Sequence, residues 1–155
     1  MPKDSSRGIS PSLAGFLLVV CLAASYAVPY YAVTVKEAYE KREWSKTGLS
    51  GAEIDEWKRE KISRRMAVRW RNAGFKPPHA SIWIKEGFEP EDAGMWNSKG
   101  FWPHEAVSWG KAGFAPDEAA EWKETGFYYS IAKDWKRKGV GPADAAVRRK
   151  KGEWP

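Results

Sequence analysis

Cysteine is nearly absent from the sequence, and its scarcity excludes two classes of site. Cys21 is the only cysteine among the 155 residues, so the chain can form neither an internal disulfide nor a thiolate metal cluster. A lipoprotein role for Cys21 is disfavoured because Val20, rather than a small residue, stands before it. Stability must therefore come from the packing of side chains.

Histidine is almost as rare, and recognisable catalytic patterns are missing. His79 and His104 are the only histidines. No serine or cysteine nucleophile has a partner at a motif spacing, and no H-E-x-x-H, P-loop or dinucleotide fingerprint occurs. We therefore expect a protein that is not an enzyme and that has no catalytic, cofactor-binding or metal-binding residues. A pair of carboxylates brought together by stacked repeats is the remaining enzymatic alternative.

Charge is missing from one long stretch near the N-terminus. No residue between Gly8 and Val35 is charged, and residues 13–35 are apolar over the roughly 20 positions that a membrane-spanning helix requires. Tyrosines gather toward the far end of this stretch, where amphipathic rings favour a membrane interface. The pattern predicts a polar tail over residues 1–12, a transmembrane helix over 13–35 and a juxtamembrane linker or helix over 36–43.

A cleaved signal peptide is the main alternative to this anchor. Lys3 and Arg7 would form its basic region, residues 13–24 its apolar region and residues 25–27 (Ser-Tyr-Ala) its cleavage site. The uncharged run continues to Val35, which a signal peptide does not need, so a single-pass membrane anchor is favoured. Two other interpretations remain: a secreted or periplasmic chain that is cleaved near Ala27, and a helix that is buried within a soluble domain.

The basic residues flanking the segment slightly favour a cytoplasmic location for the part that follows it. Lys3, Arg7 and the terminal amine precede the segment, and four basic residues follow it closely: Lys36, Lys41, Arg42 and Lys46.

Tryptophan is unusually frequent and strictly periodic. Eight of the ten tryptophans are spaced by 13 residues without insertion or deletion: Trp44, Trp57, Trp70, Trp83, Trp96, Trp109, Trp122 and Trp135. A glycine stands four residues after each tryptophan, except at Lys61, and an apolar residue follows it. The unit is W-x-x-x-G-F-x-P-x-(D/E)-A-x-x. It predicts tandem repeats over residues 44–155.

Each unit has the local signals of one short helix. Proline suits the first helical position, and an acidic residue two places later complements the positive end of the helix dipole. Glycine suits the left-handed residue that ends a helix, followed by the apolar contact of a Schellman motif. The pattern predicts a helix over residues 90–99, about 15 Å long. The residue before the proline is never Ser, Thr, Asp or Asn, so side-chain capping is not expected.

Such short helices are unstable alone, and stacking is how repeats of this kind become stable. We therefore expect an all-α protein, in which a transmembrane or signal helix precedes a solenoid-like array, with the periodic tryptophans as its core. Units at both ends depart from the pattern, with Gly51 in place of proline and Arg148 in place of tryptophan. Terminal units of solenoids are commonly atypical.

Charge along the array alternates in sign. Residues 57–76 hold eight basic residues against Glu60, residues 77–130 have a net charge of −5, and residues 131–155 a net charge of +5. The first basic segment is a candidate contact with anionic lipid or with nucleic-acid phosphate, or is a solvated helix face. Its candidate residues are Arg59, Arg64, Arg65, Arg69 and Arg71.

These features favour a membrane-anchored scaffold or protein-interaction module, whose partners are membrane lipid through residues 13–35 and a protein. The candidate protein contacts lie outside the regular core positions: Trp102, Tyr128, Tyr129, Ile82 and Ile84. A plain packing role is the alternative for the large aromatic residues Trp102 and Tyr128. The alternative is a secreted or periplasmic module that recognises polysaccharide or nucleic acid through Trp and Arg.

Overall fold

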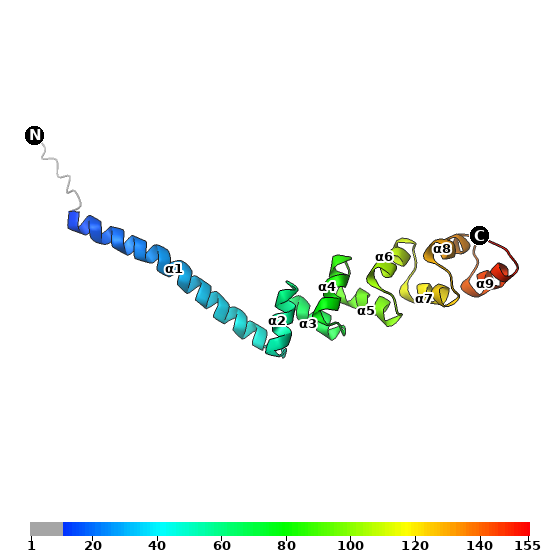
Figure 1. Cartoon of the computed structure of the whole chain (residues 1–155), viewed down its shortest axis with the longest axis horizontal. Helices are drawn as coiled ribbons and strands as arrows, with labels where there is room; N and C mark the ends of the chain where they lie inside the picture. The colour runs from blue at the N-terminus through cyan, green and yellow to red at the C-terminus, as the bar shows by residue number, and fades with distance from the viewer. Residues whose placement is uncertain (1–10) are drawn as a thin grey trace, which may run out of the picture. The chain divides into compact units, whose positions relative to one another are not determined.

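The computed structural model describes residues 11–155, and every regular element within them is an α-helix. The chain divides into two units, residues 1–50 and 51–155. The first holds one long helix, and the second holds short helices that follow one another (Figure 1). The predicted all-α fold, with a long apolar helix before a regular array, is confirmed. Residues 1–10 of the predicted polar tail lie outside the described residues.

The long helix, α1 (Pro11–Ser45), extends beyond the transmembrane helix that the sequence predicts over residues 13–35. It continues without interruption through residues 36–43 and includes Trp44, the first tryptophan of the periodic series. Its segment Phe16–Ser45 is long and apolar enough to cross a membrane. Large apolar side chains of this segment are exposed, among them Phe16, Leu18, Val28, Tyr31 and Val35.

The second unit consists of helices that repeat with the period of the sequence. Each helix within residues 51–155 is nine residues long: α2 (Gly51–Arg59), α3 (Arg64–Asn72), α4 (Pro77–Lys85), α5 (Pro90–Ser98), α6 (Pro103–Lys111), α7 (Pro116–Glu124), α8 (Tyr129–Arg137) and α9 (Pro142–Lys150). Proline begins five of them, as predicted, and the residue before it is extended and makes no side-chain cap. Lys99 lies just beyond α5, so this helix is one residue shorter than predicted.

Glycine ends the helices in the predicted left-handed conformation. Gly113 has a φ of +87°, and its N–H donates to the carbonyl of Gly110 at 2.9 Å. The N–H of Phe114 donates to the carbonyl of Trp109 at 3.1 Å, which completes the Schellman motif. Lys61 adopts the same conformation, with a φ of +57°, although it is not glycine.

The periodic tryptophans form the core of the array. From Trp57 to Trp135 all seven are buried, and the alanines of the repeat are buried beside them. Tryptophan and phenylalanine rings alternate edge to face along the array, for example Trp96, Phe101 and Trp109 with centroids 5.0 and 6.0 Å apart. Each such pair adds about 0.5–1.5 kcal/mol to the burial of its rings. The interpretation of these tryptophans as core is therefore confirmed.

Candidate functional site

A cationic side chain ties each helix of the C-terminal half to a junction two helices back. Lys123 follows Trp122 in α7, and its Nζ donates to the carbonyl oxygen of Gly100 at 3.2 Å. It lies 4.5 Å from the ring centroid of Phe101 and 3.0 Å from Oε1 of Glu105. We call this arrangement of cation, glycine carbonyl and phenylalanine ring a cation lock.

The same lock recurs one period later. Lys136 donates to the carbonyl oxygen of Gly113 at 3.0 Å, lies 4.6 Å from the ring centroid of Phe114 and pairs with Glu118 at 2.7 Å. Carbonyl groups at a helix C-terminus carry partial negative charge and lack partners within the helix. The lysine therefore both satisfies a carbonyl and complements the helix dipole.

A third lock at the end of the array uses arginine. Arg149 donates to the carbonyl oxygens of Gly126 at 3.1 Å and Thr125 at 2.8 Å, and lies 4.3 Å from the ring centroid of Phe127. Ile131 occupies the position that Glu105 and Glu118 hold in the other locks. The carbonyl and the ring are thus the constant parts of the lock, and the carboxylate is an optional part.

The carboxylate of Glu105 has two roles. It accepts a hydrogen bond from the backbone N–H of Trp102 at 2.9 Å, and it pairs with Lys123. Burial raises the pKa of Glu105, but the N–H of Trp102 and the ammonium of Lys123 together lower it below its ordinary value. The carboxylate therefore remains ionised and holds both the start of α6 and the lock.

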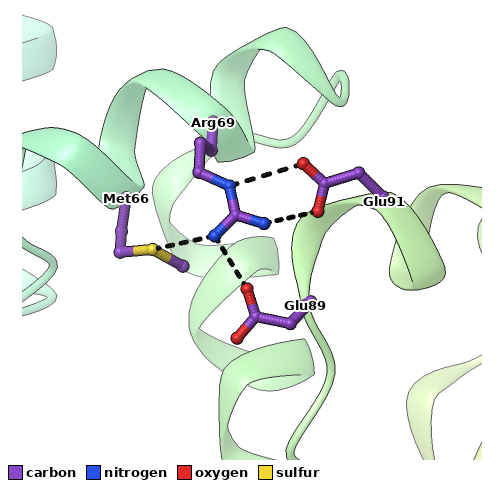
Figure 2. Close-up of polar contacts among 4 residues, drawn as sticks. All are labelled: Met66, Arg69, Glu89 and Glu91. Atoms are coloured by element: carbon purple, nitrogen blue, oxygen red, sulfur yellow. Dashed lines mark hydrogen bonds and ion pairs between the residues drawn. The ribbon is translucent and has the colours of Figure 1, made fainter.

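A different ion-pair cluster links α3 to the start of α5. Arg69 donates to Glu91 through two nitrogens, at 2.6 and 3.4 Å, and to Glu89 at 2.8 Å, as Figure 2 shows. Its hydrogen bonds to Glu91 raise the pKa of Arg69, and the guanidinium lowers the pKa of Glu91. Met66 Sδ lies 3.6 Å from the same guanidinium. An anionic ligand would have to displace two carboxylates to reach Arg69.

The lock position is not cationic in the middle of the array. The residue directly after the tryptophan is Ile84 in α4, Asn97 in α5 and Gly110 in α6. Where Asn97 takes this position, a cavity of about 310 Å³ opens, and it is lined by Gly74, Phe75 and Asn97 among others. Gly74 and Phe75, which correspond to the glycine and phenylalanine of a lock, thus line this cavity, and no lysine or arginine is among its lining residues.

Two of the predicted protein contacts meet at this cavity. Trp102 and Ile82 both line it, with 64% and 44% of their surfaces exposed. The other three candidates lie elsewhere: Ile84 lines a separate groove, Tyr129 packs its ring 6.3 Å from that of Trp109, and Tyr128 is 80% exposed. The structure therefore brings together one pair of the five residues.

The predicted lipid or phosphate contacts do not share one environment. Arg59 and Arg65 are exposed, and Arg59 lies 3.9 Å from Glu56. Arg64 and Arg71 are half-buried, and Arg69 is held by its two glutamates. Arg59 and Arg65 are consequently the members of this set whose side chains are most open to an anionic surface.

No similarity to a characterised protein indicates a role for this cavity. Comparisons with family models, curated proteins and solved structures found no match to the chain. Within residues 11–155, no group of three His, Cys, Asp or Glu side chains is placed to hold a metal ion. The cavity that Trp102 and Ile82 line is the candidate functional site, because these two exposed apolar side chains meet there.

Phe75, His79 and Asn97 line this cavity, although none of them was a candidate contact from the sequence. The signal that would have found them is the 13-residue register itself. Asn97 and His79 stand two periods before Lys123 and Glu105, so both members of an ion pair are replaced together.

Proposed function

We propose that the chain is a non-enzymatic, membrane-anchored helical-repeat protein whose array binds a partner protein at the membrane surface. The observation that carries this proposal is the cavity where Trp102 and Ile82 meet, because exposed aromatic and aliphatic side chains around a concavity are typical of interaction sites. The array supplies a rigid support for the site through its buried tryptophans and its locks.

The exposed apolar surface of α1 supports the membrane part of the proposal. A helix with side chains such as Leu18, Val28 and Val35 facing outward is not stable in water unless lipid or protein covers it. The 30 residues of Phe16–Ser45 exceed the roughly 20 that cross a bilayer. Membrane anchoring accounts for this surface without a further subunit.

Fractionation and N-terminal sequencing of the mature chain test the anchor. We expect an uncleaved chain that stays in the membrane fraction after washing with high salt and then with alkaline carbonate. A mature N-terminus at Val28, or release by either wash, would overturn the anchor. The first result would favour the secreted or periplasmic polysaccharide or nucleic-acid module, although the burial of seven periodic tryptophans removes most of its proposed stacking platforms.

Site-specific photo-crosslinking in native membranes tests the interaction. A photoreactive residue at position 102 should form an adduct with a protein, whereas the same probe at position 128 is the matched control. Both positions precede the first residue of a helix, and only Trp102 lines the cavity. Equal adducts at both positions, or none at position 102, would contradict a partner at this cavity.

A further inference from the structure

Asn97 occupies the lock position of α5, two 13-residue periods before Lys123. Its own junction is formed by Gly74 and Phe75, which correspond to Gly100 and Phe101 in the lock of Lys123. Gly74, Phe75 and Asn97 line one cavity. The three positions that the 13-residue repeat assigns to a lock therefore also lie together in the fold. This junction has the glycine and phenylalanine of a lock, but the side chain at the cation position, Asn97, is shorter than lysine and uncharged.

His79 replaces the carboxylate of the lock in the same cavity. It stands where Glu105 and Glu118 stand in the later locks. A neutral imidazole nitrogen and the amide oxygen of Asn97 are hydrogen-bond acceptors. Among residues 11–155, the structure records no hydrogen bond from another residue to either side chain or to the carbonyl of Gly74. The cavity thus contains acceptors and aromatic rings, and no lysine or arginine lines it. Lys123 contacts two of its lining residues, Gly100 and Phe101, but this cation is already paired with Glu105.

We infer that this cavity binds the cationic end of a lysine or arginine side chain presented by the partner protein, in place of the missing lock cation. The inference rests on the proposed function and names the chemistry that the partner presents. The chain itself supplies the precedent, because Lys123, Lys136 and Arg149 fill three equivalent positions from within. Both cationic side-chain types occur among these three, so the site accepts either.

Charge and size agree with such an occupant. Eight of the ten residues that line the cavity lie within residues 77–130, whose net charge of −5 attracts a basic partner, whereas Gly74 and Phe75 lie at the end of the basic segment 57–76. The cavity volume of about 310 Å³ is enough for one long side chain. Trp102 and Ile82 stand where they cover the apolar stem of that side chain.

A titration of the full chain in detergent micelles tests the inference directly. The probes are N-acetyl-lysine amide, N-acetyl-arginine amide and N-acetyl-norleucine amide, which has an apolar side chain without the charge. The indole N–H signal of Trp102 reports binding, and it is assigned with the Trp102→Phe variant. We expect saturable shifts with dissociation constants in the millimolar range for the two cations, and binding at least about tenfold weaker for norleucine. Equal binding of all three probes, or no binding of either cation, would overturn it.

A double variant supplies the missing lock from within. His79→Glu together with Asn97→Lys leaves the net charge unchanged and copies the residues at positions 105 and 123. We expect this variant to unfold at a higher denaturant concentration and to lose the saturable shift with both cations. Unchanged binding by a folded double variant would contradict the inference. Tyr128→Ala, which removes an exposed aromatic outside the cavity, is the control and should bind as the unmodified chain does.

The two proposals fail in different ways. Probe binding is measured without a partner, whereas crosslinking at position 102 needs one. Crosslinking to a protein while neither cation binds would overturn the cationic occupant and leave the proposed function standing. Binding of both cations without a crosslinked protein would overturn the partner and leave the cation site.

Discussion

Lys123 donates a 3.2 Å hydrogen bond to the carbonyl oxygen of Gly100, although 23 residues separate the two in the chain. The bond links α7 to the end of α5, which are not consecutive helices. Contacts between next-but-one units add to the stacking of nearest neighbours, so each lock stiffens the array over three helices. Denaturation of the full chain in detergent, monitored by tryptophan fluorescence, measures the stability that the locks, the core and the helix ends contribute.

Removal of one lock cation should weaken the array measurably. In Lys123→Met the stem remains while the hydrogen bond, ion pair and ring contact are lost, so we expect the free energy of unfolding to fall by about 1 kcal/mol. The effect is limited because 40% of this side chain is exposed to solvent. Lys111→Met is the control, since Lys111 is exposed at the end of α6, and a loss as large as that of Lys123→Met would contradict the lock.

A new lock should form at position 110, the one of the three central lock positions (84, 97 and 110) for which the repeat keeps the acidic residue, here Asp92. Gly110 stands at the lock position opposite Gly87, Phe88 and Asp92, and an added Cβ would meet Trp96 at an ordinary 3.9 Å. We expect Gly110→Ala to stabilise the array by about 1 kcal/mol through helix propensity. Gly110→Lys should stabilise it by about a further 0.5–1 kcal/mol through the lock. Equal midpoints for the two variants would show that no lock forms.

The two kinds of tryptophan should respond differently to truncation. Trp109 is 4% exposed, so Trp109→Ala should lower the free energy of unfolding by about 3–5 kcal/mol. Trp102 is exposed, and Trp102→Ala should change it by less than about 0.5 kcal/mol. A large loss of stability in Trp102→Ala would assign that residue to the core.

Reciprocal substitutions test the left-handed helix ends. Lys61 adopts a φ of +57°, where a side chain costs about 1–2 kcal/mol, so Lys61→Gly should stabilise the array by about 1 kcal/mol. Gly113→Ala, at a φ of +87° with no atom near its Cβ, should destabilise it by a similar amount. Gly94→Ala, within α5, is the control and should stabilise, because the backbone there is helical. The measurement is the denaturation midpoint, which should rise for Lys61→Gly and Gly94→Ala and fall for Gly113→Ala. A shift of the opposite sign at Lys61 or Gly113 would contradict the left-handed helix end there.

Acid should release the lock that contains Glu105. Because the folded state lowers the pKa of Glu105, its contribution is fully present above the ordinary pKa of 4.5 and is lost as pH falls through the lower folded value. The stability difference between the unmodified chain and Glu105→Gln should therefore be largest near neutral pH and vanish in strong acid. Denaturation midpoints measured across this range provide the check, and a difference independent of pH would exclude the ionised pair.

Much of the fold follows from local chemistry that the sequence displays. Proline and glycine at fixed places determine where each short helix begins and ends, because both act through the backbone of their immediate neighbours. The period of the tryptophans places them on one face of every helix, which predicts their burial. The departure of Trp102 from this register likewise predicts that it lies outside the core.

The candidate site was less predictable from the sequence, because it depends on which side chains of different repeats lie close together. The proline, glycine and tryptophan signals act within one repeat and do not determine this. The sequence grouped Trp102 and Ile82 with Tyr128, Tyr129 and Ile84, and only the first two meet at the cavity. It also grouped Arg69 with the other candidate lipid or phosphate contacts, whereas Glu89 and Glu91 hold its side chain.

The sequence by itself determined the repeat, its helix ends and its aromatic core, because each depends on residues within one unit. Only the tertiary structure decided that Lys123, Lys136 and Arg149 each reach a glycine carbonyl 23 residues earlier. That reach depends on how each helix turns relative to the last, and this angle arises from packing among several units. The lock of Lys123 and the open cavity at Asn97 are two results of the same stacking, one with a cation of the chain in place and one without.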